Sequence, residues 1–239
     1  MILTGKIVYP HLFAPQAYDE KSDKKFSCSL LLPKSDPHAT EVVAKVNSLI
    51  NEKLGGEPAT RHPFIASWRE MYRSFGTKPG DYRPSAEALV RRALKTGSLP
   101  SINTAVDAYN AVSVRHLIPM GGFDLDRVAG DIRLRFSGGG EEFTPLGSDK
   151  TELTYVGEVV YADDERILTR RWNYRDCDVT KITEGTRNAV LFADGPEGVP
   201  RSAVEDALLD LEKLLRDVCG GDYRSGVAWA DENEVALLP

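Results

Sequence analysis

The sequence predicts an α+β fold in which helices precede a mixed or antiparallel sheet and one further helix follows it. Three observations predict this order. Apolar residues recur at helical spacing between residues 61 and 117, alternate with charged residues after residue 130, and return to helical spacing after residue 200. Helices and strands that are segregated along a chain are typical of α+β proteins.

With 239 residues the chain is long enough to bury a core in one or two domains. Apolar residues make up 41% of it and charged residues 28%, as in ordinary soluble proteins. No apolar run approaches the roughly 18 residues of a membrane span, and the first residues lack the layout of a signal peptide. We therefore expect a cytoplasmic protein with no membrane partner.

The residues that most often bind metals are scattered: Cys28, Cys177, Cys219, His11, His38, His62 and His116. They form no CxxC or HxxxH pair, so the sequence predicts neither a metal site nor a disulfide framework. The glycine turn at residues 138–140 lacks the Lys-Ser/Thr of a phosphate-binding P-loop. We expect no cofactor.

Charge is distributed unevenly along the chain. Residues 61–117 carry nine Lys or Arg against four Asp or Glu, whereas residues 194–239 carry four against eleven. A basic middle favours an anionic partner such as nucleic acid, although both segments could be solvated faces that partly pair with each other.

The use of basic residues also changes near residue 60. Residues 1–60 contain seven Lys and no Arg, and residues 61–239 contain five Lys and eighteen Arg. We divide the chain into an N-terminal β-β-α segment (1–60), a central domain (61–195), and a C-terminal helix with an acidic tail (196–239) that packs on the same domain. In the first segment, TGKIVYP and KKFSCSLLLPK read as strands, and Asp36-Pro37 opens a helix.

Two helices are expected in HPFIASWREMYRSFG and SAEALVRRALKTG. In the first, Trp68, Tyr72 and Phe75 share one apolar face and should be core; in the second, Ser85 is the expected N-cap. The outer faces of both helices are basic. The candidate nucleic-acid-binding residues on them are Arg69, Arg73, Arg91, Arg92 and Lys95.

A third helix, NTAVDAYNAV, has a polar face. Asn103, Asp107 and Asn110 recur at i, i+4 and i+7, which places two amides and a carboxylate on one side. Buried polar groups cost free energy unless they are paired. This face therefore either braces neighbouring loops or lines a ligand pocket.

After Gly130 the sequence becomes strand-like. DIRLRFS alternates apolar and charged residues, and EEFTPLG, GEVVYADD, RILTRRWNYRD and NAVLFAD read as further short strands. The Gly-Gly at residues 121–122 reads as a turn. The final helix, RSAVEDALLDLEKLLRDVCGG, should begin with a capping box formed by Ser202 and Glu205.

From about His62 to Asp194 the chain resembles the B3/B4 domain of the phenylalanyl-tRNA synthetase beta subunit, and more closely the free-standing bacterial proteins built from that domain. The motifs that carry the resemblance are HPFIASWREMYRSFG, YRPSAEALVRRALKTGSLPSINTAVDAYN, GFDLDRVAGDIRLR, GEVVYADDERILTRRWNYRD and TKITEGTRNAVLF. The resemblance implies an α+β fold that cradles an amino-acid-sized ligand. It also implies hydrolysis of tyrosine wrongly attached to the tRNA for phenylalanine.

Three departures from the family pattern bear on that hydrolysis. Gly121 stands where the family has a histidine, Phe192 stands where it has a pocket glutamate, and ILTRRWNYRD replaces a glycine-rich strand. Ester hydrolysis depends on oriented polar groups. We therefore assign no catalytic residue, and expect any enzymatic activity to be weak deacylation of aminoacyl-tRNA.

The same departures suggest a different lining. Arginine can hold a carboxylate or phosphate through two parallel hydrogen bonds, and Trp172 offers a flat ring for stacking. Together with the polar helix face, the candidate ligand-binding residues are Asn103, Asp107, Asn110, Arg135, Glu158, Arg171, Trp172 and Asn173. The alternative is an exposed strand with salt-bridged arginines.

Three functions follow from the sequence. The first is binding of tRNA, aminoacyl-tRNA or an amino-acid-like ligand, with residual editing at most. The second is small-molecule binding without catalysis. The third is binding of single-stranded DNA, because residues 1–55 resemble phage single-stranded-DNA-binding proteins of the OB-fold type through TGKIVYPHLFAP and KKFSCSLLLPKSDP. Two strands cannot close an OB barrel, so the third is the weakest of the three.

Overall fold

The computed structural model describes residues 6–8, 48–223, 225–226, 228 and 234–236. Residues 48–54 are helical, and they precede four helices and two short 3-10 segments. These are η1 (Ala59–Arg61), α2 (Pro63–Ser74), α3 (Ser85–Thr96), α4 (Thr104–His116), η2 (Leu125–Arg127) and α5 (Arg201–Cys219). None of the described helices is long and apolar enough to cross a bilayer.

The largest sheet has six strands in the order β10-β1-β3-β6-β7-β8. Its neighbours run antiparallel except for β1 and β3, which are parallel. Two further pairs, β2 with β9 and β4 with β5, are antiparallel. The strands are β1 (Lys6–Val8), β2 (Met120–Asp124), β3 (Ile132–Gly138), β4 (Glu142–Phe143), β5 (Glu152–Leu153), β6 (Val156–Ala162), β7 (Ile167–Arg170), β8 (Arg175–Asp176), β9 (Ala189–Ala193) and β10 (Glu234–Ala236).

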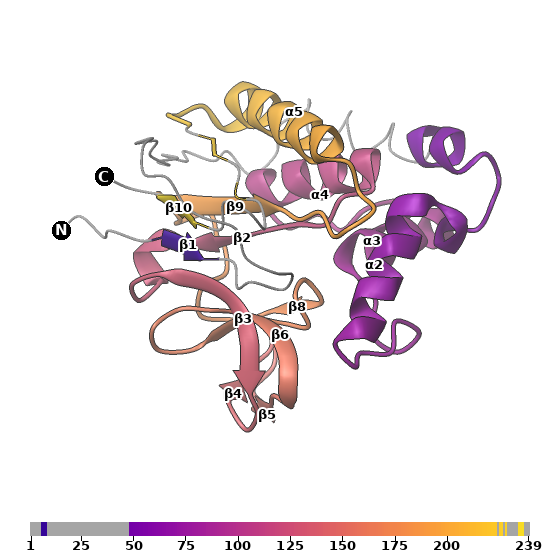
Figure 1. Ribbon diagram of the computed structural model, residues 1–239. Helices are drawn as coiled ribbons and strands as arrows, with labels where there is room; N and C mark the ends of the chain where they lie inside the picture. The colour runs from indigo at the N-terminus through magenta and orange to yellow at the C-terminus, as the bar shows by residue number, and fades with distance from the viewer. Residues whose placement is uncertain (1–5, 9–47, 224, 227, 229–233, 237–239) are drawn as a thin grey trace.

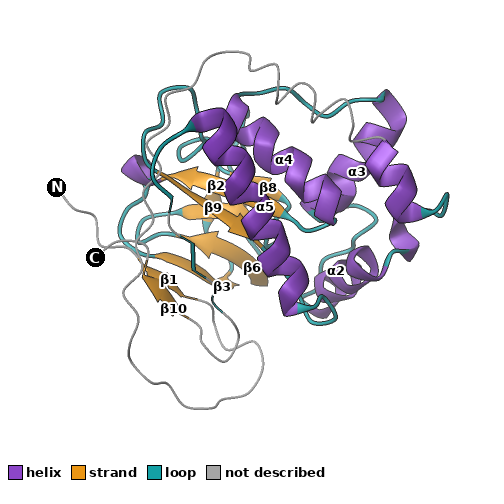
Figure 2. Cartoon of the chain, turned by 90° about the horizontal axis from the view of Figure 1, so that it is seen from above, coloured by secondary structure: helices purple, strands orange, loops and turns teal. Residues whose placement is uncertain are grey.

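The described part of the chain is built in layers. Helix α5 lies on α4, the β2–β9 pair lies beneath them, and the sheet that contains β3 and β6 lies on the far side of that pair (Figure 1). Helices α2 and α3 stand at one side of these layers, as the view from above also shows (Figure 2). The sequence prediction of an α+β fold with a mixed sheet and a C-terminal helix is confirmed.

Two large apolar clusters lie on either side of the β2–β9 pair. One joins the six-stranded sheet to α2 and contains Trp68, Tyr72 and Phe75, which are 0%, 0% and 9% exposed. The other packs α5 against α4 through residues such as Leu211 and Val112. The expectation that the three aromatic residues of α2 are core is confirmed.

The expected turn at Gly121–Gly122 is wrong, because both residues lie inside β2. A side chain at Gly122 would approach the carbonyl oxygen of Val190 to 2.6 Å, so the close pairing of β2 with β9 requires glycine there. The glycine that read as a turn signal instead permits two strands to approach.

The expected single strand RILTRRWNYRD is also wrong. It is broken into β7 and β8 by a turn in which Arg171 and Trp172 have φ values of 49° and 65°. The backbone N–H of Trp172 donates to the carbonyl oxygen of Val159 at 2.7 Å and holds the turn against β6. Sequence periodicity does not detect left-handed residues other than glycine.

Neither expected serine cap forms. Pro84 and Pro200 occupy the N-cap positions of α3 and α5, and neither helix receives a side-chain cap hydrogen bond. Each proline fixes an extended backbone immediately before the first helical turn, so Ser85 becomes the first residue of α3 and Ser202 lies inside α5.

Most of the expected N-terminal segment, residues 9–47, lies outside the described residues. Of its first expected strand, β1 is described. Ile7 pairs with Ile132 of β3 on one side and with Val235 of β10 on the other. Residues from both ends of the chain therefore extend the central sheet.

Candidate functional site

Polar side chains from distant parts of the sequence meet inside the apolar core beside α2. We call Tyr72, Tyr161, Trp172, Asn173, Asp176 and Asp194 the buried aspartate cluster. Helix α2 supplies Tyr72, β6 supplies Tyr161, and the turn between β7 and β8 supplies Trp172 and Asn173. Asp176 ends β8, and Asp194 directly follows β9.

Hydrogen bonds fix these side chains. The Tyr161 hydroxyl donates to Asp194 Oδ1 at 2.7 Å, and the Tyr72 hydroxyl donates to Asn173 Oδ1 at 2.8 Å. Thr169 Oγ1 donates to Asp176 Oδ1 at 2.7 Å. Helix α2, the sheet and the end of β9 are thereby joined through polar contacts within an apolar surrounding.

Both carboxyl groups of the cluster hold protons more tightly than exposed ones do. Burial raises the pKa of Asp194 to about 6, against the opposing hydrogen bonds of Tyr161, Trp172 and Asn173, and the charge of Asp176 raises it further. Burial likewise raises the pKa of Asp176 to about 6, against the hydrogen bond from Thr169. Perturbed carboxyl groups of this kind gather at functional sites.

Two hydrogen-bond donors of the cluster interact with Asp194 but are not satisfied by it. Trp172 Nε1 and Asn173 Nδ2 are buried and make no hydrogen bond of ordinary geometry with any residue that the structure describes. Trp172 itself is 7% exposed. A buried donor without a partner costs free energy, and such a donor in a native protein needs an explanation. Because both donors lie beside Asp194, a ligand placed there would meet a carboxylate acceptor and two incompletely satisfied donors together.

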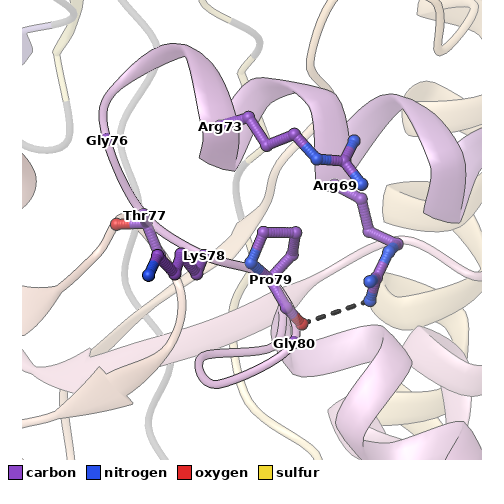
Figure 3. A pocket seen from close by; sticks show the side chains of 7 residues that line it. All are labelled: Arg69, Arg73, Gly76, Thr77, Lys78, Pro79 and Gly80. Carbon is purple, nitrogen blue, oxygen red and sulfur yellow. Dashed lines mark hydrogen bonds between the residues drawn. The ribbon is translucent and has the colours of Figure 1, made fainter.

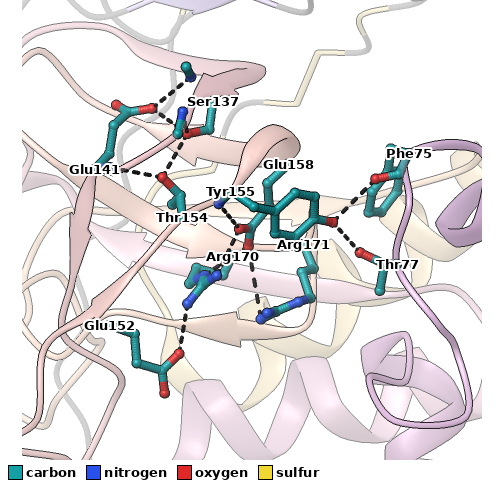
Figure 4. A network of polar contacts seen from close by, with 12 residues as sticks. Phe75, Thr77, Ser137, Glu141, Glu152, Thr154, Tyr155, Glu158, Arg170 and Arg171 are labelled. Carbon is teal, nitrogen blue, oxygen red and sulfur yellow. Dashed lines mark hydrogen bonds and ion pairs between the residues drawn. The ribbon is translucent and has the colours of Figure 1, made fainter.

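The predicted ligand-binding residues of the sheet lie close to one another. Glu158 is fully buried and receives two hydrogen bonds of 2.8 Å from Arg170, with Arg171 at 3.9 Å (Figure 4). The guanidinium of Arg171 lies 3.7 Å from the centre of the Tyr82 ring. Trp172 and Asn173 follow in the same turn. The alternative of an exposed strand is excluded for Arg170 and Arg171, which are 4% and 7% exposed.

Two residues of the polar α4 face brace loops instead. Asn103 caps α4 by accepting from the N–H of Val106 at 3.0 Å, and it donates to the carbonyl oxygen of Ile182 at 3.1 Å. Asp107 accepts from the N–H of Ile102 at 2.8 Å and from the hydroxyl of Ser101 at 3.0 Å.

The rest of that predicted set is divided. Asn110 is buried within α4, and Arg135 forms a two-pronged ion pair with Glu141 at 2.5 and 2.9 Å. Tyr109, on the same helix as Asn110, lies near enough to the cluster for the charge of Asp176 to act on it. Burial raises the pKa of Tyr109, and the charge of Asp176 adds to that rise ahead of the charge of Asp107.

Two of the predicted nucleic-acid-binding residues, Arg69 and Arg73, line a surface pocket of about 400 Å³. The turn at residues 76–80 forms its other wall (Figure 3). Arg91 does not line the pocket, but it shares the carboxylate of Glu87 with Arg69. Arg92 and Lys95 are exposed on α3.

Four residues of the cluster were not predicted as site residues from the sequence: Tyr72, Tyr161, Asp176 and Asp194. Tyr72 was predicted as core and Tyr161 as part of the strand GEVVYADD, and both are buried. The signal for Asp194 was its place directly after the apolar run AVLFA, where a carboxylate ends a buried strand. Across the described ranges, no three His, Cys, Asp or Glu side chains are grouped as metal ligands would be.

Comparison with known proteins gives the chain a family. The family described as "B3/4 domain" matches residues 67–220, more than half of the chain. The phenylalanine–tRNA ligase beta subunit of Yersinia pestis is 25% identical over 214 residues, which cover 80% of this chain and 26% of that protein. The same subunit of Leifsonia xyli subsp. xyli is 31% identical over 150 residues, which cover 62% of this chain and 17% of that protein.

The chain therefore spans about a quarter or less of the length of these relatives. Among solved structures, an N-terminal fragment of the phenylalanyl-tRNA synthetase beta subunit from Pyrococcus horikoshii aligns with a TM-score of 0.41 and 15% identity. That alignment covers 48% of this chain and 40% of the fragment.

Proposed function

The chain belongs to the B3/4 domain family, and from that premise we propose that it binds an amino acid, free or esterified to tRNA, at the buried aspartate cluster. The relatives are named for phenylalanine and tRNA, which motivates the ligand class. The observation that carries the proposal is the proximity of two carboxyl groups with raised pKa values to two buried donors, Trp172 Nε1 and Asn173 Nδ2, that lack a hydrogen bond of ordinary geometry.

An amino acid matches this set of groups. Its ammonium group would donate to the carboxylate oxygens of Asp194 and Asp176, and charge-assisted hydrogen bonds of this kind are the stronger ones. Its carboxyl or ester oxygens would accept from Trp172 Nε1 and Asn173 Nδ2. With pKa values of about 6, both aspartates are mainly ionised at neutral pH, although less firmly than exposed aspartates.

The apolar surroundings suit an aromatic or aliphatic side chain. Trp68 packs edge-on against Trp172 with ring centres 5.1 Å apart, and Phe192 stacks on Tyr161 at 5.1 Å. Ligand sites are commonly lined by such rings around a few oriented polar groups.

The same region supports binding rather than hydrolysis. Gly121 and Phe192, the two positions at which the chain departs from the polar family pattern, are register partners across β2 and β9. Neither has a polar side chain with which to orient a water molecule or stabilise a developing negative charge. We propose that ester hydrolysis, where present at all, is slow deacylation of aminoacyl-tRNA.

Calorimetric titration of the whole chain with amino acids and aminoacyl-adenylate analogues tests the proposal. We expect heat with at least one of them, and a ten-fold or greater loss of affinity for Asp194→Asn, because a hydrogen bond to a charged group contributes about 1.5–3 kcal/mol. Absence of heat with every ligand would contradict the proposal.

Asp124→Asn is a matched control. Asp124 is 5% exposed and accepts from the hydroxyl of Thr186 at 2.7 Å, much as Asp194 accepts from Tyr161, but it lies at the opposite end of the β2–β9 pair. Its substitution should leave the affinity unchanged. An equal loss in both variants would indicate general damage to the fold.

Small-molecule binding without any tRNA is an outcome of the same titration, namely heat with free amino acids and no gain from the tRNA ester. The single-stranded-DNA alternative rests on residues 1–55, most of which lie outside the described residues. The described residues of that segment, 6–8 and 48–55, take no part in the buried aspartate cluster.

A further inference from the structure

A basic pocket lies where α2 ends and the chain turns back toward α3. Arg69 and Arg73 stand one helical turn apart on the same face of α2, and Lys78 belongs to the turn at residues 76–80 (Figure 3). The pocket measures about 400 Å³, and none of the residues that line it carries a carboxyl group. Its lining therefore favours an anion.

Arg69 is held in place before any ligand arrives. Its Nη1 donates to the carbonyl oxygen of Pro79 at 3.2 Å and to both carboxylate oxygens of Glu87 at 2.9 Å. Glu87 is fully buried and also accepts a hydrogen bond of 2.9 Å from Nε of Arg91. One carboxylate thus serves two guanidinium groups, which leaves a net positive charge that extends from the pocket onto α3.

The other two cations, Arg73 and Lys78, are exposed and accessible to a ligand. Arg73 pairs with Glu70 at 2.8 Å, but the two side chains are 53% and 75% exposed, and ion pairs so exposed contribute little. Lys78 is exposed and forms no ion pair with any residue that the structure describes. Asp81 is an exposed carboxylate on the same turn and does not line the pocket.

The pocket is connected to the buried aspartate cluster. Tyr72 and Arg73 are adjacent on α2, one reaching Asn173 inside and the other lining the pocket outside. The turn is also fixed to the sheet, because the hydroxyls of Thr77 and Tyr155 lie 2.5 Å apart (Figure 4). A ligand that occupied both the pocket and the cluster would reach from one side of helix α2 to the other.

We propose that this pocket binds a phosphodiester of an RNA strand, with Arg73 and Lys78 contacting phosphate oxygens and Arg69 as the fixed donor. The inference rests on the proposed function in taking tRNA as the RNA that carries the amino acid. Guanidinium groups match phosphate geometry, and contacts of this kind position a nucleic acid without reading its sequence. The row of cations through Arg69 and Arg91 is longer than one isolated anion needs, which favours a polymer over a single phosphate ion.

The test is the salt dependence of binding between the whole chain and uncharged tRNA. Each phosphate contact that is lost lowers the slope of log K against log salt by about 0.7–0.9. For Arg73→Gln/Lys78→Gln we therefore expect a slope lower by about 1.5, and an affinity at 0.1 M salt weaker by about five- to eight-fold per contact. An unchanged slope would overturn the inference, as would competition by polyglutamate as effective as that by RNA.

Arg216→Gln/Lys181→Gln is the matched control. Arg216 and Lys181 are 48% and 43% exposed, each pairs with a carboxylate on its own segment, and neither lines the pocket. Their loss should leave the slope unchanged; a fall equal to that of the pocket variant would overturn the inference.

The outcomes separate this inference from the proposed function. The pocket variant should keep the calorimetric heat with amino acids, and Asp194→Asn should keep the slope with tRNA. If the wild-type chain gives heat with amino acids but does not bind tRNA, the inference fails and the amino-acid site stands. If it binds tRNA with the expected slope but gives no heat, the proposed function fails alone.

Discussion

Tyr72 on α2 donates a hydrogen bond of 2.8 Å to Asn173, which lies 101 residues later in the sequence. Tyr72 belongs to the apolar core and Asn173 is partly buried beside it, so the contact ties the helix to the turn between β7 and β8. The same turn places Trp172 beside Asp194. The geometry of the proposed amino-acid site thus depends on one helix-to-sheet hydrogen bond.

Replacing Tyr72 by Phe removes that hydrogen bond and keeps the ring. The free energy of unfolding should fall by about 1–3 kcal/mol, because Asn173 Oδ1, which is partly buried, loses its donor. Urea denaturation measures the change. Ser74→Ala, which removes an exposed hydroxyl from the same helix, should cost less than about 0.5 kcal/mol. Equal effects of the two substitutions would show that the Tyr72 bond has no special role.

Protonation of the aspartate cluster should stabilise the fold. The pKa values of Asp176 and Asp194 are about 6 in the folded chain, whereas an exposed aspartate has a pKa of 3.8. The folded chain therefore binds more protons than the unfolded chain between pH 4 and 6. The free energy of unfolding contributed by these groups therefore falls as the pH rises from about 4 to 6 and is level above that. Urea titrations across this range should show a smaller fall for Asp194→Asn.

Glu141 serves as a control because its pKa is shifted in the opposite direction. The hydrogen bond from Arg135 lowers its pKa to about 2, so its stabilising contribution is present above pH 4.5 and is lost as the pH falls toward 2. Glu141→Gln should therefore alter the stability curve only below about pH 4.5. A difference between wild type and Asp194→Asn that is confined to that acid range would contradict the assignment of raised pKa values.

Removing only one charge of the buried ion pair between Glu158 and Arg170 should destabilise the fold strongly. Glu158→Gln leaves the guanidinium of Arg170 buried with a partial partner, and breaking a buried pair in this way costs about 3–5 kcal/mol. Glu152→Gln removes the other carboxylate on Arg170, which lies 2.7 Å away but is 47% exposed, and should cost less than about 1 kcal/mol. Thermal and urea unfolding of both variants will compare them. Similar costs would mean that burial of Glu158 is unimportant.

Deacylation of tyrosine from the tRNA for phenylalanine should be absent or slow. The positions that carry polar groups in the family pattern are Gly121 and Phe192 here, and they face each other across two strands. Release of labelled tyrosine from mischarged tRNA measures the rate. Rapid turnover that is lost in Asn110→Ala or Asp194→Asn would contradict this expectation and assign chemistry to the site.

The sequence predicted the fold class and most elements because their signals are local. Helical spacing in α2 and alternation in β3 each reflect a face buried against the core. The failures were local patterns overridden by tertiary contacts. Gly122 serves close strand pairing rather than a turn, and Arg171 and Trp172 adopt left-handed backbone that β6 stabilises through Val159.

The candidate site was predicted in part. Trp172 and Asn173 were selected because an Arg- and Trp-rich stretch is unusual, and both belong to the cluster. Asp194 was missed because its role depends on Tyr161, which lies 33 residues earlier, and no local pattern records that contact. Asn103 and Asp107 were selected for helical spacing, which cannot distinguish a cap from a pocket wall.

The central claim is that Asp194 and Trp172 hold an amino acid between them. Crystals of the chain grown with saturating phenylalanine or tyrosine test it most directly. We predict electron density for the ligand with its ammonium group within hydrogen-bond distance of Asp194 and a carboxyl oxygen within hydrogen-bond distance of Trp172 Nε1. A well-ordered cluster with no ligand density, or a ligand bound elsewhere on the chain, would contradict the claim.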